Sequence, residues 1–65
     1  MIKQYRHYKG GIYEFVCTAK LESDPGVQMV VYKSADGSIW TRPASVFFEP
    51  VVHNGQTIPR FQLIE

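Results

Sequence analysis

Few side chains in this chain of 65 residues could act as nucleophiles or metal ligands. The single cysteine, Cys17, lies between Phe15 and Ala19 in an alternating apolar run, which predicts a small core residue rather than a reactive thiolate. The histidines, His7 and His53, are far apart and have no neighbouring cysteine or carboxylate cluster, whereas zinc needs several such ligands. We therefore expect no metal, no cofactor and no enzyme activity.

Aromatic and basic residues form the more informative group. The segment Tyr5-Arg6-His7-Tyr8-Lys9 alternates between them, and if extended it places Tyr5, His7 and Lys9 on one face. Further along, Trp40 and Arg42 alternate onto one face of a predicted strand. The candidate binding residues are Tyr5, His7, Tyr8, Lys9, Tyr13, Trp40, Arg42 and Arg60. Tyr13 is the weakest of them, because its position in a strand predicts burial.

This group has three interpretations. Arginine beside exposed aromatic rings is used to bind nucleic acids or nucleotides, and the same residue types dominate the centres of protein interfaces. They also occur where a cation simply packs on a ring. Arg42 and Arg60, each beside a proline, could clamp an anion or form salt bridges with acids such as Glu14 or Glu49.

The elements that must position these residues are short strands. Turn signals recur at Gly10-Gly11, Asp24-Pro25-Gly26, Asp36-Gly37 and Asn54-Gly55. Between them we expect strands at 13–21, with its odd residues facing the core, at 29–32, covered on both faces, and at 39–42, 48–52 and 60–64. Only Pro43 to Phe47 could form a helical turn. The pattern predicts an all-β domain of five or six short antiparallel strands that curl into a small barrel.

Composition sets the class of protein. Apolar residues make up 45% of the chain and charged residues 20%, which is typical of a globular protein. One domain over residues 1–65 is expected. The residues Met1 to Gly11 lack the apolar stretch of a signal peptide, no apolar run is long enough to cross a membrane, and the lone thiol fits a reducing compartment. We therefore expect a cytoplasmic protein. A net charge of only +1 argues against strong nucleic-acid binding.

Four runs of the sequence form a recognisable pattern. They are Tyr5-Arg6-His7-Tyr8-Lys9-Gly10-Gly11-Ile12-Tyr13, Val30-Val31-Tyr32, Trp40-Thr41-Arg42-Pro43 with Phe47, and Pro59-Arg60-Phe61. In these runs the chain resembles the bacterial and phage family of domains of unknown function DUF1653, from Tyr5 to Ile64, with a shorter loop after Tyr32. The resemblance implies a compact SH3-like barrel and implies no activity.

The sequence favours a binding module for a protein or peptide partner. Its supporting feature is a content of tyrosine, tryptophan and arginine beyond the needs of so small a core. A homodimer is a special case of this interpretation, since a small core gains from burial between subunits. The alternative is a nucleic-acid or nucleotide binder that uses the aromatic and basic surface.

Overall fold

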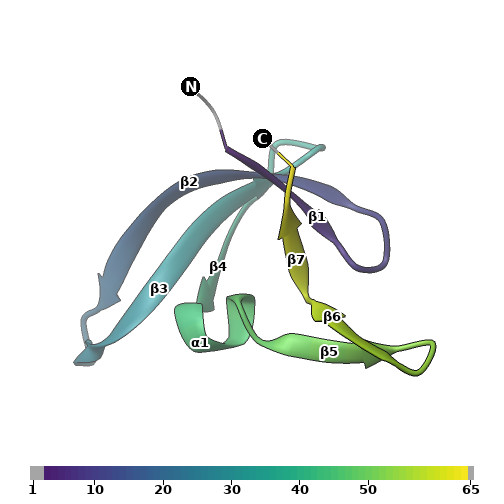
Figure 1. Cartoon of the computed structure of the whole chain (residues 1–65). Helices are drawn as coiled ribbons and strands as arrows, with labels where there is room; N and C mark the ends of the chain where they lie inside the picture. Colours follow the sequence, from purple (N-terminus) through teal and green to yellow (C-terminus); the bar gives the residue numbers. More distant parts are fainter. Residues whose placement is uncertain (1–2, 65) are drawn as a thin grey trace.

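The computed structural model describes residues 3–64, so the ends of the domain expected over residues 1–65 lie outside the described residues. This part of the chain is built from antiparallel strands and one helical turn, as predicted, with seven strands in place of five or six (Figure 1). The elements are β1 (Gln4–His7), β2 (Ile12–Leu21), β3 (Asp24–Ser34), β4 (Ile39–Pro43), α1 (Ala44–Phe47), β5 (Pro50–His53), β6 (Gln56–Pro59) and β7 (Phe61–Leu63).

The strands form two sheets. Five of them lie in the order β4-β3-β2-β1-β7, and β5 and β6 form a separate hairpin. In Figure 1 the strands β2, β3 and β4 arch over α1, while β7 lies on the other side of it. Within residues 3–64 the edge strands β4 and β7 are not hydrogen-bonded to each other, so the backbone does not close the predicted barrel. The helical element α1 has four residues, and no described helix is long and apolar enough to cross a membrane.

Three of the four predicted turns are confirmed by their backbone angles. The first is at Gly10-Gly11, between β1 and β2, with Gly10 at a φ of 111°. Asn54 and Gly55 have φ values of 53° and 77°, as the Asn-Gly signal predicted, but they join β5 to β6 rather than to a strand at 60–64. The turn at Asp36-Gly37 joins β3 to β4, with Gly37 at a φ of 89°. The backbone N–H of Ser34 donates to the carbonyl oxygen of Ser38 at 2.9 Å, which leaves a loop of three residues, one longer than a minimal hairpin.

The turn predicted at Asp24-Pro25-Gly26 was misplaced. Leu21 pairs with Asp24, so the chain reverses at residues 22–23, and β3 already includes Asp24-Pro25-Gly26. Proline is compatible with this position because it lies at the start of the strand, where no ladder donor is required of it. The hairpin of β2 and β3 is consequently long, and its outer half extends beyond the part of β2 that pairs with β1.

A β-bulge in β2 overturns the predicted inward face of this strand. Phe15 pairs with Tyr32 and Cys17 with Val31, so Val16 is the extra residue. Because the side chains of a strand alternate, one extra residue exchanges the two faces from that point onward. The odd residues beyond the bulge, which we predicted to be core, are exposed: Cys17, Ala19 and Leu21.

The core is small and mostly aromatic. Its buried side chains are Val30, Tyr32, Phe47 and Phe61, and the rings of Phe47 and Phe61 stack with centroids 4.1 Å apart. We predicted that residues 29–32 would be covered on both faces. In the structure only the alternate residues Val30 and Tyr32 of β3 are buried, so this prediction was wrong. Each aromatic ring contributes a large apolar area, so most of the folding energy depends on a few side chains.

Candidate binding site

A pocket of about 220 Å³ lies on the inner face of the five-stranded sheet. We call it the aromatic pocket, and it is lined by His7, Tyr13, Tyr32, Trp40, Arg42 and Phe61. Every strand of the sheet contributes at least one of these residues. The pocket contains no carboxylate, and four of the predicted site residues meet in it.

Strand register explains why these side chains converge. Trp40 and Arg42 are two residues apart in β4, so they point to the same face, as predicted. Trp40 pairs with Tyr32 on β3, and His7 pairs with Phe61 across β1 and β7. Paired residues share a face of a sheet, so each pair places two lining side chains side by side.

The aromatic rings contact one another mainly edge to face. Tyr13 lies 5.5 Å from Tyr32 and 5.7 Å from Phe61, and His7 lies 4.9 Å from Phe61, all measured between ring centroids. The planes of these pairs are inclined by 77° to 82°. This is the arrangement that aromatic quadrupoles favour, and it fixes the walls of the pocket before any ligand arrives.

Trp40 is held in place although 52% of it is exposed. Its indole Nε1–H donates to Oγ of Ser34 at 3.0 Å, and this hydroxyl donates to Oδ1 of Asp36 at 2.5 Å. The hydrogen bonds from Ser34 and Ser38 hold the pKa of the Asp36 carboxyl below its ordinary value, so it stays charged at neutral pH. The chain thus presents an exposed but oriented indole ring.

Arg42 carries the positive charge of the aromatic pocket. Its guanidinium carbon lies 5.8 Å from the ring centroid of Phe61, within the range of a cation–π contact. This contact joins β4 to β7, the two edges of the sheet that the backbone leaves unpaired. Within residues 3–64 the Arg42 side chain has neither a hydrogen bond nor an ion pair. Its fork of donors is therefore available to a ligand.

His7 is neutral under ordinary conditions. Burial, and then the positive charges of Arg42, Arg60 and Lys9, hold its pKa below the ordinary value of 6.5. Its Nδ1 accepts a hydrogen bond from the backbone N–H of Lys9 at 3.1 Å, which leaves the ring proton on Nε2. The same cations that depress this pKa make the pocket attractive to an anion.

Two predicted residues lie at the rim of the aromatic pocket rather than inside it. The ring of Tyr8 lies 4.7 Å from that of His7 and 5.5 Å from that of His53, between centroids. The ammonium group of Lys9 lies 5.8 Å from the centroid of Tyr8. Both residues are placed to touch a ligand that extends beyond the pocket.

The other two predicted residues have structural contacts. Tyr5 packs edge to face against Phe47, with centroids 5.3 Å apart, and so belongs to the margin of the core. Arg60 forms a salt bridge with Glu49 at 3.4 Å, which confirms one of the two interpretations of this arginine. Sequence reasoning treated Arg42 and Arg60 alike, and the structure separates them.

Tyr32 and Phe61 are the lining residues that the candidate set lacked. Both are buried, and both were visible as aromatic residues near the candidates. Pairing Tyr32 with Trp40 requires the three-residue loop between β3 and β4, whereas a two-residue loop at Asp36-Gly37 would shift the register by one. Phe61 lies only two residues after Pro59, at the start of a strand of three residues, so no alternating pattern predicts which face of the sheet it occupies.

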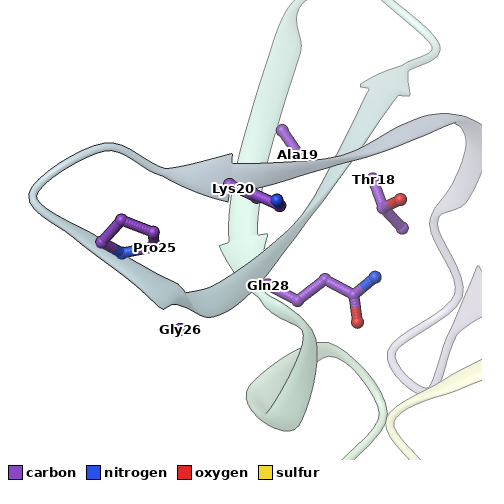
Figure 2. Close-up of a pocket in the computed structure, with 6 residues that line it drawn as sticks. All are labelled: Thr18, Ala19, Lys20, Pro25, Gly26 and Gln28. Atoms are coloured by element: carbon purple, nitrogen blue, oxygen red, sulfur yellow. The ribbon is translucent and has the colours of Figure 1, made fainter.

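Two other hollows help to define the site. One of about 380 Å³, which we call the turn hollow, is lined by Tyr13 and Trp40 together with Asp36 and other residues near the β3–β4 turn, so it shares two walls with the aromatic pocket. The other, of about 360 Å³, lies near the end of the β2–β3 hairpin (Figure 2). We call it the hairpin hollow; it is lined by Thr18, Ala19, Lys20, Pro25, Gly26 and Gln28.

Within residues 3–64, no group of three or more histidine, cysteine, aspartate or glutamate side chains could hold a metal ion. The comparisons with curated proteins and with solved structures return no match. Residues 3–63 match the family model described as "Protein of unknown function (DUF1653)". These residues are nearly the whole chain, and the protein therefore belongs to the DUF1653 family.

Proposed function

We propose that this domain is a binding module, rather than an enzyme, and that it holds a peptide segment of a partner protein at the aromatic pocket. The observation that carries the proposal is the convergence of one exposed, hydrogen-bonded Trp40 and one unpaired Arg42 on a wall of fixed aromatic rings, among the described residues. Tryptophan and arginine in such settings supply most of the binding energy of protein interfaces.

The size of the site favours a peptide. A pocket of about 220 Å³ is smaller than the usual site for a small organic ligand and suits one side chain. The turn hollow shares Tyr13 and Trp40 with the aromatic pocket, so alternate side chains of an extended segment can occupy the two hollows. Holding an extended peptide by alternate side chains is a common recognition mode.

Nucleic acid is the weaker candidate ligand. A phosphate backbone needs a continuous path of cations, but a strand running from the aromatic pocket into the turn hollow would meet the charged carboxylate of Asp36. Lys9 and Arg60 lie close enough to His7 to lower its pKa, as Arg42 does, but Arg60 is paired with Glu49. Lys3 and Lys20 lie elsewhere, near Phe15 and in the hairpin hollow. A single available arginine does not make such a path.

The fold can be assigned more finely as part of this proposal. We infer an SH3-like barrel in which side chains, rather than backbone hydrogen bonds, join the sheet edges. The support is the contact between Arg42 on β4 and Phe61 on β7, together with α1 packed against β3 and β4. The aromatic pocket then lies where the two edges of the sheet approach each other.

Peptide selection tests the proposed function. A phage-displayed library of random peptides is selected on the intact domain, and the affinities of recovered peptides are measured by the fluorescence of Trp40, the one tryptophan in the sequence. Binding to Trp40→Phe and Trp40→Ala is measured by polarisation of labelled peptide. We expect Trp40→Ala to weaken binding about tenfold or more. Ile39→Ala is the matched control, because Ile39 is similarly exposed (59%) on the opposite face of β4.

Three outcomes would overturn this function. The first is a selection in which no peptide distinguishes the wild-type domain from Trp40→Ala. The second is equal loss of affinity in Ile39→Ala, which would place the interface on the other face of the sheet. The third is binding of short single-stranded DNA or RNA in place of peptides, with affinity that falls steeply as salt rises.

A further inference from the structure

We infer that the group held in the aromatic pocket is a carboxylate, the side chain of an aspartate or glutamate in the partner peptide, and that Arg42 binds it; this inference rests on the proposed function. The pocket has aromatic walls and one guanidinium group, and it has no acidic lining residue. An arginine fork matches the two oxygens of a carboxylate, and such charge-assisted pairs are among the stronger hydrogen bonds.

The surroundings of Arg42 support an anion in three ways. Its guanidinium group has no acidic partner within residues 3–64, whereas Nη2 of Arg60 lies 3.4 Å from the Glu49 carboxylate. The ring of Phe61, 5.8 Å away, limits the positions that the guanidinium group can adopt. His7 lies near Arg42 and is neutral. It can donate a hydrogen bond from its Nε2–H to an anion that Arg42 binds.

The charge of the turn hollow determines which of the two hollows can hold an acidic side chain of the peptide. Asp36 lines the turn hollow and stays charged, so a carboxylate there would be repelled, while the aromatic pocket attracts it. The two hollows share Tyr13 and Trp40 and are therefore adjacent. The aromatic pocket favours an acidic side chain of the peptide, and the turn hollow disfavours one. Such an unfavourable place is an effective source of specificity.

One carboxylate also fits the number of available cations. Lys9 lies at the rim against Tyr8, Arg60 is paired, and Arg42 remains as the one fork facing the pocket within residues 3–64. A phosphate group of higher charge is usually bound by several such donors. The pocket thus provides for one planar monoanion that is flanked by apolar surface.

Small aromatic anions test the assignment directly. Benzoate, its uncharged isostere benzamide, and phenyl phosphate are titrated at about physiological salt, where charges beyond roughly 8 Å are screened. The readout is the indole Nε1–H resonance of Trp40 in the amide NMR spectrum, a single signal in this chain. We expect benzoate to bind with a Kd on the order of millimolar and benzamide at least tenfold more weakly.

Variants of Arg42 and Arg6 distinguish the effect of the charge inside the aromatic pocket from that of the net charge of the domain. Arg42→Gln should reduce the preference for benzoate over benzamide to about twofold or less, and Arg42→Lys should keep part of it, because lysine retains the charge without the fork. Arg6→Gln is the matched control: it makes the same change of charge at an exposed residue of β1, on the face opposite to His7. It should leave the preference unchanged.

The selected peptides provide the second test. A recovered peptide should contain an aspartate or glutamate whose replacement by asparagine or glutamine weakens binding to the wild-type domain about tenfold and leaves binding to Arg42→Gln nearly unchanged. This is a double-mutant cycle, and it isolates the interaction between the two groups.

The two proposals fail in different ways. Equal binding of benzoate and benzamide, or peptides without a required acid, would overturn the carboxylate while leaving the peptide-binding function intact. Phenyl phosphate bound more than tenfold more tightly than benzoate would reassign the pocket to phosphorylated or nucleic-acid ligands. A Trp40 resonance unmoved by every probe would overturn the pocket as an anion site, and failure of the peptide selection would separately overturn the function.

Discussion

The aromatic pocket and the hairpin hollow both include residues of the long hairpin of β2 and β3 but are lined very differently. The aromatic pocket is the smaller, at about 220 Å³ against 360 Å³, yet five of its six lining residues are buried or partly buried. All six residues of the hairpin hollow are exposed. A ligand gains most from groups that are already fixed, because it need not order them. Size alone therefore does not identify the binding site.

The origin of the difference is the bulge at Val16. Before it, Tyr13 and Phe15 face inward and pack against the core, and β1 pairs with this part of β2. Beyond it, the hairpin has no third strand beside β2 in the described residues, and its inner face carries Thr18 and Lys20. One half of the hairpin thus packs on the aromatic core through both strands. The other half is supported from outside only on its β3 side, where β4 pairs with residues 29–31.

The largest effect should follow from removing a ring that serves both core and pocket. Phe61→Ala is expected to cost about 3–5 kcal/mol of unfolding free energy. A domain of this size has a total of roughly the same magnitude. The variant should therefore lack a dispersed amide NMR spectrum and a cooperative urea transition.

Leu63→Ala is the matched control for this change. Leu63 lies in the same strand, β7, but is 42% exposed, so its loss should cost no more than about 1 kcal/mol. A cooperative urea transition of Phe61→Ala near that of the wild type would show that the core does not depend on this ring. The distinction between the two halves of the hairpin would then lose its basis.

Local turn chemistry made much of the fold predictable. The signals Asn54-Gly55 and Asp36-Gly37 were placed correctly because their backbone needs are specific to those residues. The inward face of β2 was predictable only as far as Phe15. A bulge has no clear sequence signal, and every later residue of the strand, including Cys17, then reverses its facing.

The candidate site was predictable in kind but not in detail. Residue type pointed to Trp40 and Arg42, and strand alternation placed them on one face. What separates Arg42 from Arg60 is the position of Glu49, which lies eleven residues from Arg60 in the sequence and meets it through tertiary folding. No local pattern contains that information, and both arginines follow the same composition rules.

A moderate effect is expected from acid, through His7 in the aromatic pocket. Its pKa is lowered in the folded protein by burial and by nearby cations, of which Arg42 is first. Between that value and the unfolded value of 6.5, the unfolded chain binds more protons, so stability rises with pH. The stabilisation is complete above about pH 6.5 and is lost as pH falls through the folded pKa.

Urea denaturation at several pH values between about 7.5 and 5 measures this loss. His7→Gln should remove much of the slope, because glutamine does not titrate, whereas the contribution of Asp36 falls in a separate window below its ordinary pKa of 3.8. An unchanged slope in His7→Gln would mean that His7 titrates as it does in the unfolded chain. Benzoate should raise the pKa of His7 if the anion binds beside it.

The smallest effect should come from the hairpin hollow. Lys20→Ala combined with Gln28→Ala removes two exposed side chains that, within the described residues, make no side-chain hydrogen bond or salt bridge. Stability should change by no more than about 0.5 kcal/mol for each, and affinity for a selected peptide should stay within about twofold. Both are measured beside Trp40→Ala, by urea denaturation and by peptide polarisation. If the double variant weakens binding as much as Trp40→Ala, the partner contacts the hairpin hollow as well as the aromatic pocket, and rigidity does not separate a site from a surface in this fold.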